Sequence, residues 1–410
     1  MSLLVFLPWL RLQREHCVAG VEFRPFRDEG GKATPPMRGA VTALTKILSS
    51  YRDRRGRRID NCVCVTLPDR GWNLSEDDFD AIRWATSLLF LSAWACNEYF
   101  PRFAGRYVNS ETFRFVGQKY SRPRPRYIGL VSRRRDGSTW DGGYQHGEAK
   151  FSIPAQCSIR DSAALDEGFL AALDAAAAAD ARTARALKLS LPFVMLSNAD
   201  DEAMSLNAEA ILMASAFEQL ISCPSKSFEL GRKIGAMLHS FGSKTVAEAK
   251  QARPGIEIDT SKPEYAAAQP RWWVHRKWME ELYDVRSKAA HRGHHQQREW
   301  GWSLSEHLLM AAFVFPLTVK LLLQHDGYYA LTEDDEARCL AVDALLAATR
   351  WDAGEDDEEN DGEERPAGWA TILTDVRTRL RWDRIHARIF AEHPSLLGGD
   401  GTDEGPTSTS

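Results

Sequence analysis

The alternation of hydrophobic and polar residues divides the chain into two parts. Up to about residue 155, short runs rich in Val, Phe, Tyr and Ile are separated by clusters of Gly, Pro and Asp. Such runs predict β-strands. They lie at 3–10, 20–26, 61–67, 111–116, 126–132 and 148–153. One longer stretch, 76–99, predicts a helix with Ser75 as its N-cap and acidic residues in its first turn, because both features stabilise a helix N-terminus.

Beyond residue 155 the hydrophobic positions recur at helical spacing. An Ala-rich stretch, 163–187, predicts one connecting helix. Four amphipathic helices are predicted after it, at 201–222, 227–241, 272–293 and 303–324. Ser303 with Glu306 predicts a capping box at the start of the last one. Because the connecting loops are modest in length, the four helices predict an antiparallel bundle.

These patterns predict an α+β protein. Its parts are a strand-rich mixed domain at 1–155, the Ala-rich connection at 156–188, the helical bundle at 189–330, C-terminal helices at 331–395 and a tail at 396–410. The C-terminal helices are predicted at 333–350 and 369–392. We expect the tail and an acidic linker at 354–365 to be disordered, because neither has the apolar residues needed for a core.

The composition sets limits on the cellular context. The chain of 410 residues has a net charge of −5 and seven cysteines without regular spacing, which is typical of reduced thiols in a cytosol. Its first residues are apolar but lack a basic leader. The longest apolar run, 308–323, contains Pro316 and Lys320 and is short for a membrane span. We therefore expect a cytoplasmic protein that makes no use of a membrane.

Arginines gather in two groups in the strand-rich part. One group is Arg52, Arg54, Arg55, Arg57 and Arg58; the other is Arg122, Arg124, Arg126, Arg133, Arg134 and Arg135, with Tyr120 and Tyr127 beside it. Arginine interleaved with aromatic residues is suited to phosphate and base contacts in single-stranded nucleic acid. The second group is therefore a candidate nucleic-acid-binding site. A solvated loop surface is the alternative for both groups.

The candidate chemistry lies near the end of the predicted helix 272–293, at Arg286 and His291. Arginine can donate two hydrogen bonds to a phosphate, and histidine can transfer a proton near neutral pH. The same spacing recurs at Arg11/His16, Arg381/His386 and Arg388/His393, so the spacing alone is not specific. Arg286/His291 differs from the other three pairs because it lies at the end of a long amphipathic helix, with predicted apolar helices before and after it.

The residues around this pair resemble a known motif. The string Leu-Tyr-Asp-Val-Arg-Ser-Lys-Ala-Ala-His-Arg-Gly, at 282–293, is similar to the motif of the HEPN superfamily, particularly its ApeA-like branch. The segment 208–220 resembles that family's first helix, and the whole resemblance extends over roughly 190–330.

The resemblance implies a metal-independent endoribonuclease that works as a homodimer, in which two motif helices build one composite site. Arg286 and His291 are then catalytic, Tyr283, Asp284, Ser287 and Glu218 support them, and Lys288 and Arg292 contact the RNA. Such nucleases resemble toxins and antiviral effectors of bacterial defence. The N-terminal domain would then regulate the nuclease or sense a protein or small-molecule trigger. No cofactor or metal is expected.

Helix geometry limits how the pair can act. Two residues five positions apart on a straight helix are about 140° apart around its axis. Arg286 and His291 therefore meet only if the helix ends or bends between them, or if a second subunit contributes to the site. Trp272, Trp273 and Trp278 are candidate apolar anchors for such a dimer, or else core residues.

Three alternatives remain open. In a non-catalytic HEPN-like dimerisation or adaptor module, Arg286 and His291 would be a salt-bridged arginine and a histidine that caps the helix. An Arg-rich nucleic-acid-binding protein would use the N-terminal arginines instead. A metal site would use His291, His294, His295 and Glu299, but Gly293 interrupts the helical spacing that these ligands need.

Overall fold

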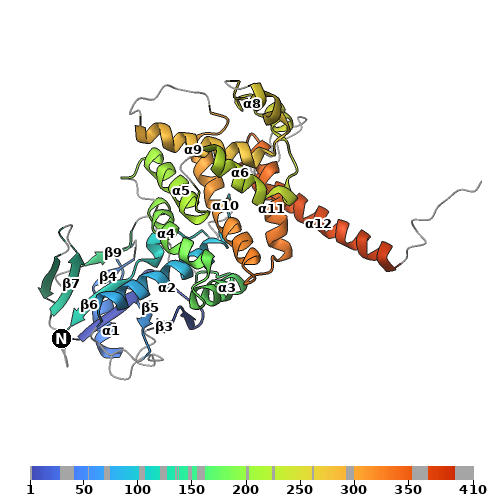
Figure 1. The fold of residues 1–410 in the computed structure, drawn as a ribbon. Helices are drawn as coiled ribbons and strands as arrows, with labels where there is room; N and C mark the ends of the chain where they lie inside the picture. The colour runs from blue at the N-terminus through green and yellow to red at the C-terminus, as the bar shows by residue number, and fades with distance from the viewer. Residues whose placement is uncertain are drawn as a thin grey trace, which may run out of the picture.

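Among the described residues, strands occur only in the N-terminal part, with helices between some of them, and the later part is helical. The computed structural model describes residues 2–27, 41–53, 55–68, 74–100, 107–120, 127–133, 136, 138–145, 150–154, 162–199, 203–223, 227–260, 263–291, 300–352 and 368–392. Within these residues an antiparallel sheet precedes a larger helical part, so the α+β class is confirmed (Figure 1). The predicted acidic linker and C-terminal tail lie outside the described residues.

The described strands of the N-terminal part form a seven-stranded antiparallel sheet. Its members are β1 (Ser2–Leu7), β2 (His16–Val18), β3 (Val21–Arg27), β5 (Asn61–Thr66), β6 (Val116–Tyr120), β7 (Tyr127–Arg133) and β8 (Thr139–Gln145), in the spatial order β2-β3-β5-β1-β6-β7-β8. In its register Phe6 is paired with Cys64, and Leu4 with Gln118. Two short strands, β4 (Tyr51–Arg52) and β9 (Phe151–Ser152), pair in parallel outside this sheet.

The two faces of the sheet pack against different helices, because successive side chains of a strand point to opposite faces. Val5 and Val63 belong to the buried cluster that contains the apolar face of α2 (Glu76–Trp94). Phe6, Cys62 and Cys64 belong to the cluster that contains α1 (Val41–Leu48). Both faces of β5 are therefore buried, which explains why its sequence is apolar at nearly every position.

The predicted strand at 111–116 is wrong. Residues Ser110–Phe113 form the 3-10 helix η1, and Asn109 begins it by accepting a hydrogen bond from the backbone N–H of Thr112 at 3.3 Å. Strand β6 starts only at Val116. The predicted strand at 148–153 is reduced to β9, whereas β2, β8 and α1 have no predicted counterpart. β2 has only three residues, and β8 contains an Asp-Gly-Gly run that is typical of turns.

The helical part contains every helix predicted after residue 200, together with two short ones. Its helices are α5 (Leu206–Leu220), α6 (Ser227–Met237), α7 (Val246–Ala252), α8 (Pro263–Ala268), α9 (Val274–His291), α10 (Leu304–His325), α11 (Glu333–Ala347) and α12 (Trp369–Glu392), with 3-10 helices η2 (His239–Phe241) and η3 (Gln269–Arg271). Helices α5, α6, α9 and α10 correspond to the four predicted bundle helices. Ser75 and Ser303 each form the N-cap of a capping box, on α2 and α10.

The Ala-rich stretch forms two helices instead of the predicted one, α3 (Glu167–Ala178) and α4 (Arg182–Ser197). Asp180 adopts a left-handed conformation with a φ of 47°, and the N–H of Ala181 donates to the carbonyl of Ala176 at 2.9 Å. This hydrogen bond ends α3, and the chain changes direction before α4. The first residues of the predicted bundle domain, from 189 on, are therefore part of α4.

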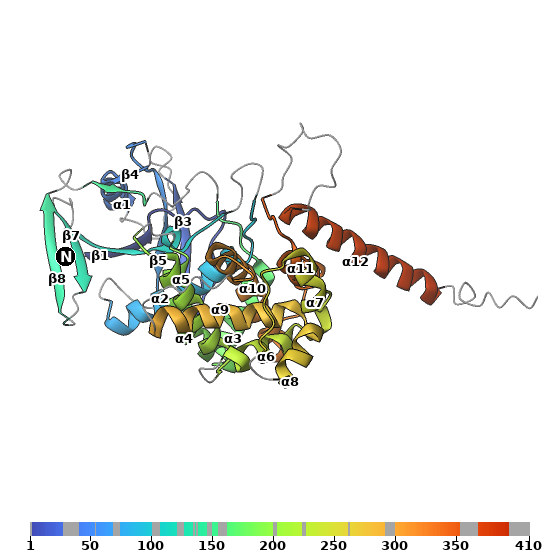
Figure 2. The same ribbon diagram turned by 90° about the horizontal axis from the view of Figure 1, so that it is seen from above.

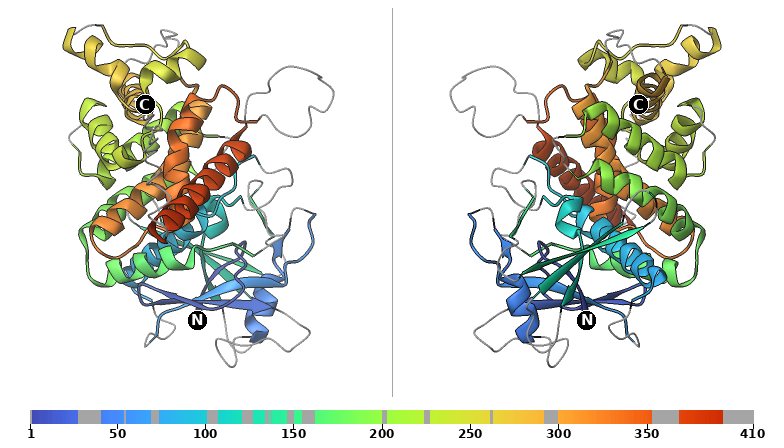
Figure 3. Two further views of the ribbon diagram at one scale, coloured as in Figure 1. Left: turned by 90° about the vertical axis from the view of Figure 1, so that its right-hand side faces the viewer. Right: turned by 90° about the vertical axis from the view of Figure 1, so that its left-hand side faces the viewer.

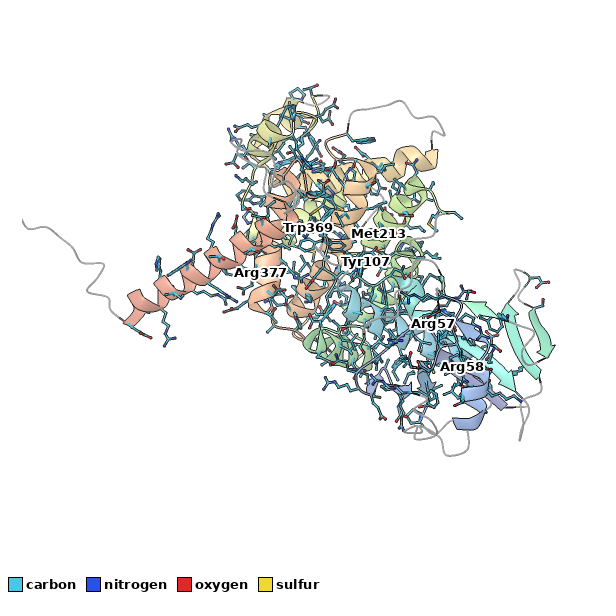
Figure 4. The ribbon with its side chains drawn as sticks, turned by 180° about the vertical axis from the view of Figure 1, so that it is seen from behind. Arg57, Arg58, Tyr107, Met213, Trp369 and Arg377 are labelled. Carbon is cyan, nitrogen blue, oxygen red and sulfur yellow. The ribbon has the colours of Figure 1, made fainter. Side chains whose placement is uncertain are left out.

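One buried cluster connects the sheet with the helical part. It runs from Val5 and Val63 through α2, α4, α5 and α9 to α11 and Trp369. Figure 1 shows α4 and α5 between α2 and α9, and Figure 3 shows the sheet at one end of the molecule beneath the helices. Helix α12 is anchored by Trp369, which is 2% exposed, and then projects from the body (Figures 2 and 4), with Trp382 57% exposed.

Among the described helices, α10 has the length and the apolar composition that a membrane span requires. Within its most apolar 18 residues, however, 72% is buried inside the protein. It also contains a buried cation: Nζ of Lys320 lies 2.6 Å from Asp166 Oδ2 and 2.5 Å from Asp335 Oδ1. These contacts join α10 to the start of α3 and to α11, as is typical of a helix in a protein core.

Candidate active site on α9

Helix α9 carries the candidate pair and is packed into the core along its length. Val274, Trp278 and Leu282 are fully buried and recur every four residues, which fixes the rotation of the helix about its axis. Trp278 is therefore a core residue and not an exposed dimer anchor. Trp272 and Trp273 are half-buried against their own chain: the Arg276 guanidinium lies 3.5 Å from the centre of the Trp272 ring.

Arg286 is held between α9 and α5. Its Nη2 lies 3.0 Å from Oε2 of Glu218, and its Nη1 donates to Glu218 Oε1 at 3.3 Å and to the hydroxyl of Tyr283 at 3.0 Å. The side chain of Glu218 is 6% exposed, whereas that of Arg286 is 25% exposed. The structure thus brings together three of the predicted site residues, and two neighbours orient a guanidinium whose side chain is partly exposed.

His291 does not approach Arg286 through a break in the helix. α9 continues to His291, so the helix does not end between the two residues. Their positions are then about 140° apart around the axis, whereas positions 284 and 287 lie within about 40° of position 291. Asp284 and Ser287, both half-buried, therefore share a helix face with position 291. Position 291 therefore lies on a different face of α9 from Arg286.

Two buried histidine–carboxylate pairs fix α9 to the helices behind it. His275 Nδ1 lies 2.7 Å from Oδ1 of Asp343 on α11, and His307 Nε2 on α10 lies 3.2 Å from Oε1 of Glu281. Both imidazoles are at most 1% exposed, so they position the helix and do not face a substrate. Neither pair is predicted from the sequence. The available signal was the polar residue at an apolar position of α11, Asp343, which is buried.

A buried carboxyl group lies where α6 approaches α9. Gly231 permits this approach, because a Cβ there would meet the carbonyl oxygen of Arg276 at 2.9 Å and the Glu280 side chain. Arg276 Nε is 3.5 Å from Glu280 Oε1, and neither atom forms a hydrogen bond within the described residues. Burial raises the pKa of Glu280 to about 7, although Arg276 and Lys277 act in the opposite direction.

In the first arginine group, Arg54 lies outside the described residues, and the other members lie at or after the C-terminal end of α1. Arg58 Nη2 donates to the carbonyl of Thr45 at 2.9 Å, and Arg57 pairs with Asp53 at 2.8 Å. Arg52 donates to the carbonyl of Ser49 and to that of Tyr51. Cations at these positions satisfy carbonyls at and after the C-terminal end of α1. Figure 4 shows Arg57 and Arg58 beside the sheet, away from α9.

Other predicted residues lie partly or wholly outside the described structure. Outside it are Arg122, Arg124, Arg126, Arg134, Arg135, Arg292, His294, His295 and Glu299. Arg133 lies in β7, and Lys288 and His291 lie in α9, with side chains outside the described set. Within the described residues, no group of three His, Cys, Asp or Glu side chains is arranged to hold a metal ion.

Comparisons with protein-family models, with curated proteins and with solved structures give no match to this chain. The likeness to HEPN nucleases therefore rests on the motif residues themselves.

Proposed function

We propose that this protein is a metal-independent endoribonuclease of the HEPN type that acts in the cytoplasm. The observation that carries the proposal is the ion pair between Arg286 and Glu218. It joins α9, which contains the motif, to α5, the segment that resembles the first helix of that family. A guanidinium held by a buried carboxylate, with its own side chain 25% exposed, is well placed to bind a phosphate.

The proposed reaction uses the RNA's own 2′-hydroxyl as the nucleophile. One His291 removes the hydroxyl proton, and the oxygen attacks the adjacent phosphorus while the bond to the 5′-oxygen breaks. The second His291 of the dimer gives a proton to the leaving 5′-oxygen. Arg286 stabilises the negative charge on the phosphoryl oxygens. The products are a 2′,3′-cyclic phosphate and a 5′-hydroxyl, and DNA is not cleaved because it lacks the nucleophile.

A homodimer supplies the second histidine. Because Arg286 and position 291 are on different sides of one helix, we place the phosphate between two α9 helices related by a two-fold axis. Helices α5, α6, α9 and α10 would form the HEPN-like antiparallel bundle that dimerises. The N-terminal sheet would control access to the site in response to a protein or small-molecule trigger. By analogy alone, such a nuclease suits a toxin or an antiviral defence effector.

The same ion pair also favours a second function. Both terminal nitrogens of Arg286 contact Glu218, as in an arginine whose role is to hold two helices together. A non-catalytic HEPN-like module would need this contact for dimerisation or adaptor binding and would not need His291. Activity of the His291 variant therefore separates the two functions.

Cleavage of total RNA by the purified protein in EDTA tests the proposal. The wild type should cleave RNA and leave DNA intact, and Arg286→Ala or His291→Ala should lower the rate by about 10²–10⁴-fold. The matched control is the double variant Arg381→Ala/His386→Ala, which removes the same spacing from the exposed part of α12 and should cleave normally. Loss of wild-type cleavage in EDTA, or full activity of His291→Ala, contradicts the proposed chemistry.

A loss of activity in Arg286→Ala also needs a folding control, since the substitution leaves the carboxylate of Glu218 buried without its cation. The double variant Glu218→Gln/Arg286→Gln removes both charges, keeps the size of the buried side chain at position 218 and shortens the half-buried side chain at position 286. We expect it to unfold at nearly the same urea concentration as the wild type and to be inactive. Recovery of cleavage in this variant would show that Arg286 has only a structural role.

Mixed dimers test the two-histidine scheme. Refolding His291→Ala together with Arg286→Ala gives heterodimers that contain one histidine and one arginine of the motif. These should remain nearly inactive if each reaction needs both histidines. Strong recovery of activity in the mixture would mean that one histidine is sufficient, and the acid–base scheme above would be wrong.

A further inference from the structure

A cavity of about 480 Å³ lies in the N-terminal part, apart from the proposed nuclease site. It lies where the chain around β2 meets the C-terminal end of α2 and the start of α3. Leu12, Ala93, Val108 and Leu165 supply apolar lining, whereas Gln13, Arg14, His16, Tyr107 and Glu167 supply polar groups. A cavity of roughly 300–1,000 Å³ with apolar walls and a few convergent polar groups is typical of small-molecule sites.

Hydrogen bonds fix the walls of this cavity. Asn97, at the end of α2, accepts from the N–H of Val108 at 2.9 Å and donates to its carbonyl at 3.2 Å. The N–H of Ala163 donates to the carbonyl of Arg11 at 2.9 Å, and the hydroxyl of Ser92 donates to the carbonyl of Asp166 at 3.0 Å. The lining segments are thus held to the sheet and to α2, so a ligand would enter a preformed site.

Among the charged groups of the cavity, more hydrogen-bond donors than acceptors remain for a ligand. Arg14 Nη2 lies 2.9 Å from Glu167 Oε1, and the second oxygen of that carboxylate lies 3.8 Å from His16 Nδ1. Both carboxylate oxygens thus have a neighbour, whereas one contact occupies only part of a guanidinium with five N–H donors. Burial lowers the pKa of His16, so that its imidazole is neutral at pH 7 and can donate or accept.

The remaining lining residue of note is aromatic. Tyr107 is 44% exposed, and its ring meets that of Tyr99 edge-on, with the ring centres 6.5 Å apart. Figure 4 places Tyr107 where the sheet meets the helical part. A tyrosine in the wall of a cavity can stack on a planar ring, and a guanidinium in the same wall can bind a phosphate.

We propose that this cavity binds a nucleoside monophosphate. The phosphate would take Arg14 as its donor, the base would stack on Tyr107, and the ribose hydroxyls would donate to the Glu167 carboxylate that the phosphate releases from Arg14. Each of these contacts uses a group that already lines the cavity. The site is separate from α9, and its ligand binding does not depend on whether the protein cleaves RNA.

Calorimetric titration of the full-length protein tests this site, with AMP, GMP, CMP and UMP as separate probes. We expect at least one of them to bind once per chain, and its nucleoside alone or inorganic phosphate alone to bind at least about tenfold more weakly. Arg14→Gln and Tyr107→Ala should each weaken binding by at least about tenfold. Arg83→Gln, which removes another exposed arginine of an Arg–carboxylate pair, should bind like the wild type.

Two further variants keep the proposal open to refutation. Ala164→Phe fills the cavity without changing a charge and should abolish binding. Glu218→Gln/Arg286→Gln removes both charges of the ion pair at the candidate nuclease site, outside the cavity, and should bind normally. Failure of all four nucleotides to bind, unchanged affinity in Arg14→Gln and Ala164→Phe, or loss of binding in Glu218→Gln/Arg286→Gln alone would overturn the assignment. That last result would place the nucleotide on α9 and leave the nuclease proposal intact.

Discussion

Glu280 is a buried carboxyl group on the motif helix whose removal should stabilise the protein. It is 8% exposed, and Arg276 Nε, 3.5 Å from its Oε1, makes no hydrogen bond to it. Burial in this position disfavours the charged form more than the nearby cations favour it, which is why its pKa rises from 4.5 to about 7. Glu280→Gln keeps the size of the side chain and cannot ionise.

The direction of the effect follows from proton binding. Because the pKa of Glu280 is higher in the folded protein, the folded state binds the proton more tightly than the unfolded chain between pH 4.5 and about 7. The wild type therefore loses stability as the pH rises through this window. The shift from 4.5 to about 7 corresponds to at most about 3 kcal/mol of unfolding free energy.

Urea unfolding of the wild type and Glu280→Gln at about pH 5 and about pH 8 measures this effect. We expect little difference between the two proteins at the lower pH, and a variant more stable by about 1–3 kcal/mol at the higher pH. Glu264→Gln, which removes an exposed carboxyl group, should show no such dependence on pH. If the wild type instead gains stability over the variant as the pH rises, then Arg276 pairs with a charged Glu280 and the argument from burial is wrong.

Two further predictions concern packing and buried charge. Gly231→Ala should lower the unfolding free energy by about 1–3 kcal/mol, because the new Cβ meets α9 backbone and Glu280, whereas Gly168→Ala, with its nearest contact at 3.8 Å, should be neutral or stabilising. Equal urea midpoints for the two variants would contradict the close approach of α6 and α9. Lys320→Met should cost about 3–5 kcal/mol, since it leaves Asp335 buried without its cation, and Lys320→Met/Asp335→Asn should recover part of that loss. No recovery in the double variant would mean that Lys320 acts through packing alone.

Local interactions made part of the fold predictable from the sequence. Ser75 and Ser303 mark helix starts correctly because a capping box involves residues only three positions apart. The break at Asp180 is harder to predict from the sequence, because Ala-rich residues favour a helix on both sides of it. Only the left-handed conformation of Asp180 separates the two helices. Strand β8 is harder still, because its Gly residues become part of a strand only by pairing with β7.

The candidate site divides in the same way. The position of Arg286 on a helix and its proximity to Glu218 follow from the amphipathic pattern together with the family resemblance. The pair between His275 and Asp343 does not, because its partners are 68 positions apart and meet only when α9 packs on α11. The spacing of Arg286 and His291 in the sequence does not say whether the helix continues between them. Because α9 continues to His291, position 291 lies on a different face of the helix from Arg286.

The claim that the RNA's 2′-hydroxyl is the nucleophile is tested most directly by removing that one oxygen atom from the substrate. An RNA oligonucleotide that the wild type cleaves at a mapped phosphate is remade with a 2′-deoxy nucleotide on the 5′ side of that phosphate, and both are incubated with the protein in EDTA. We expect cleavage at that phosphate to disappear, cleavage at other sites to continue, and the unmodified RNA to give a 2′,3′-cyclic phosphate. Cleavage of the modified phosphate at an unchanged rate would contradict attack by the 2′-hydroxyl, and with it the roles assigned to His291 and Arg286.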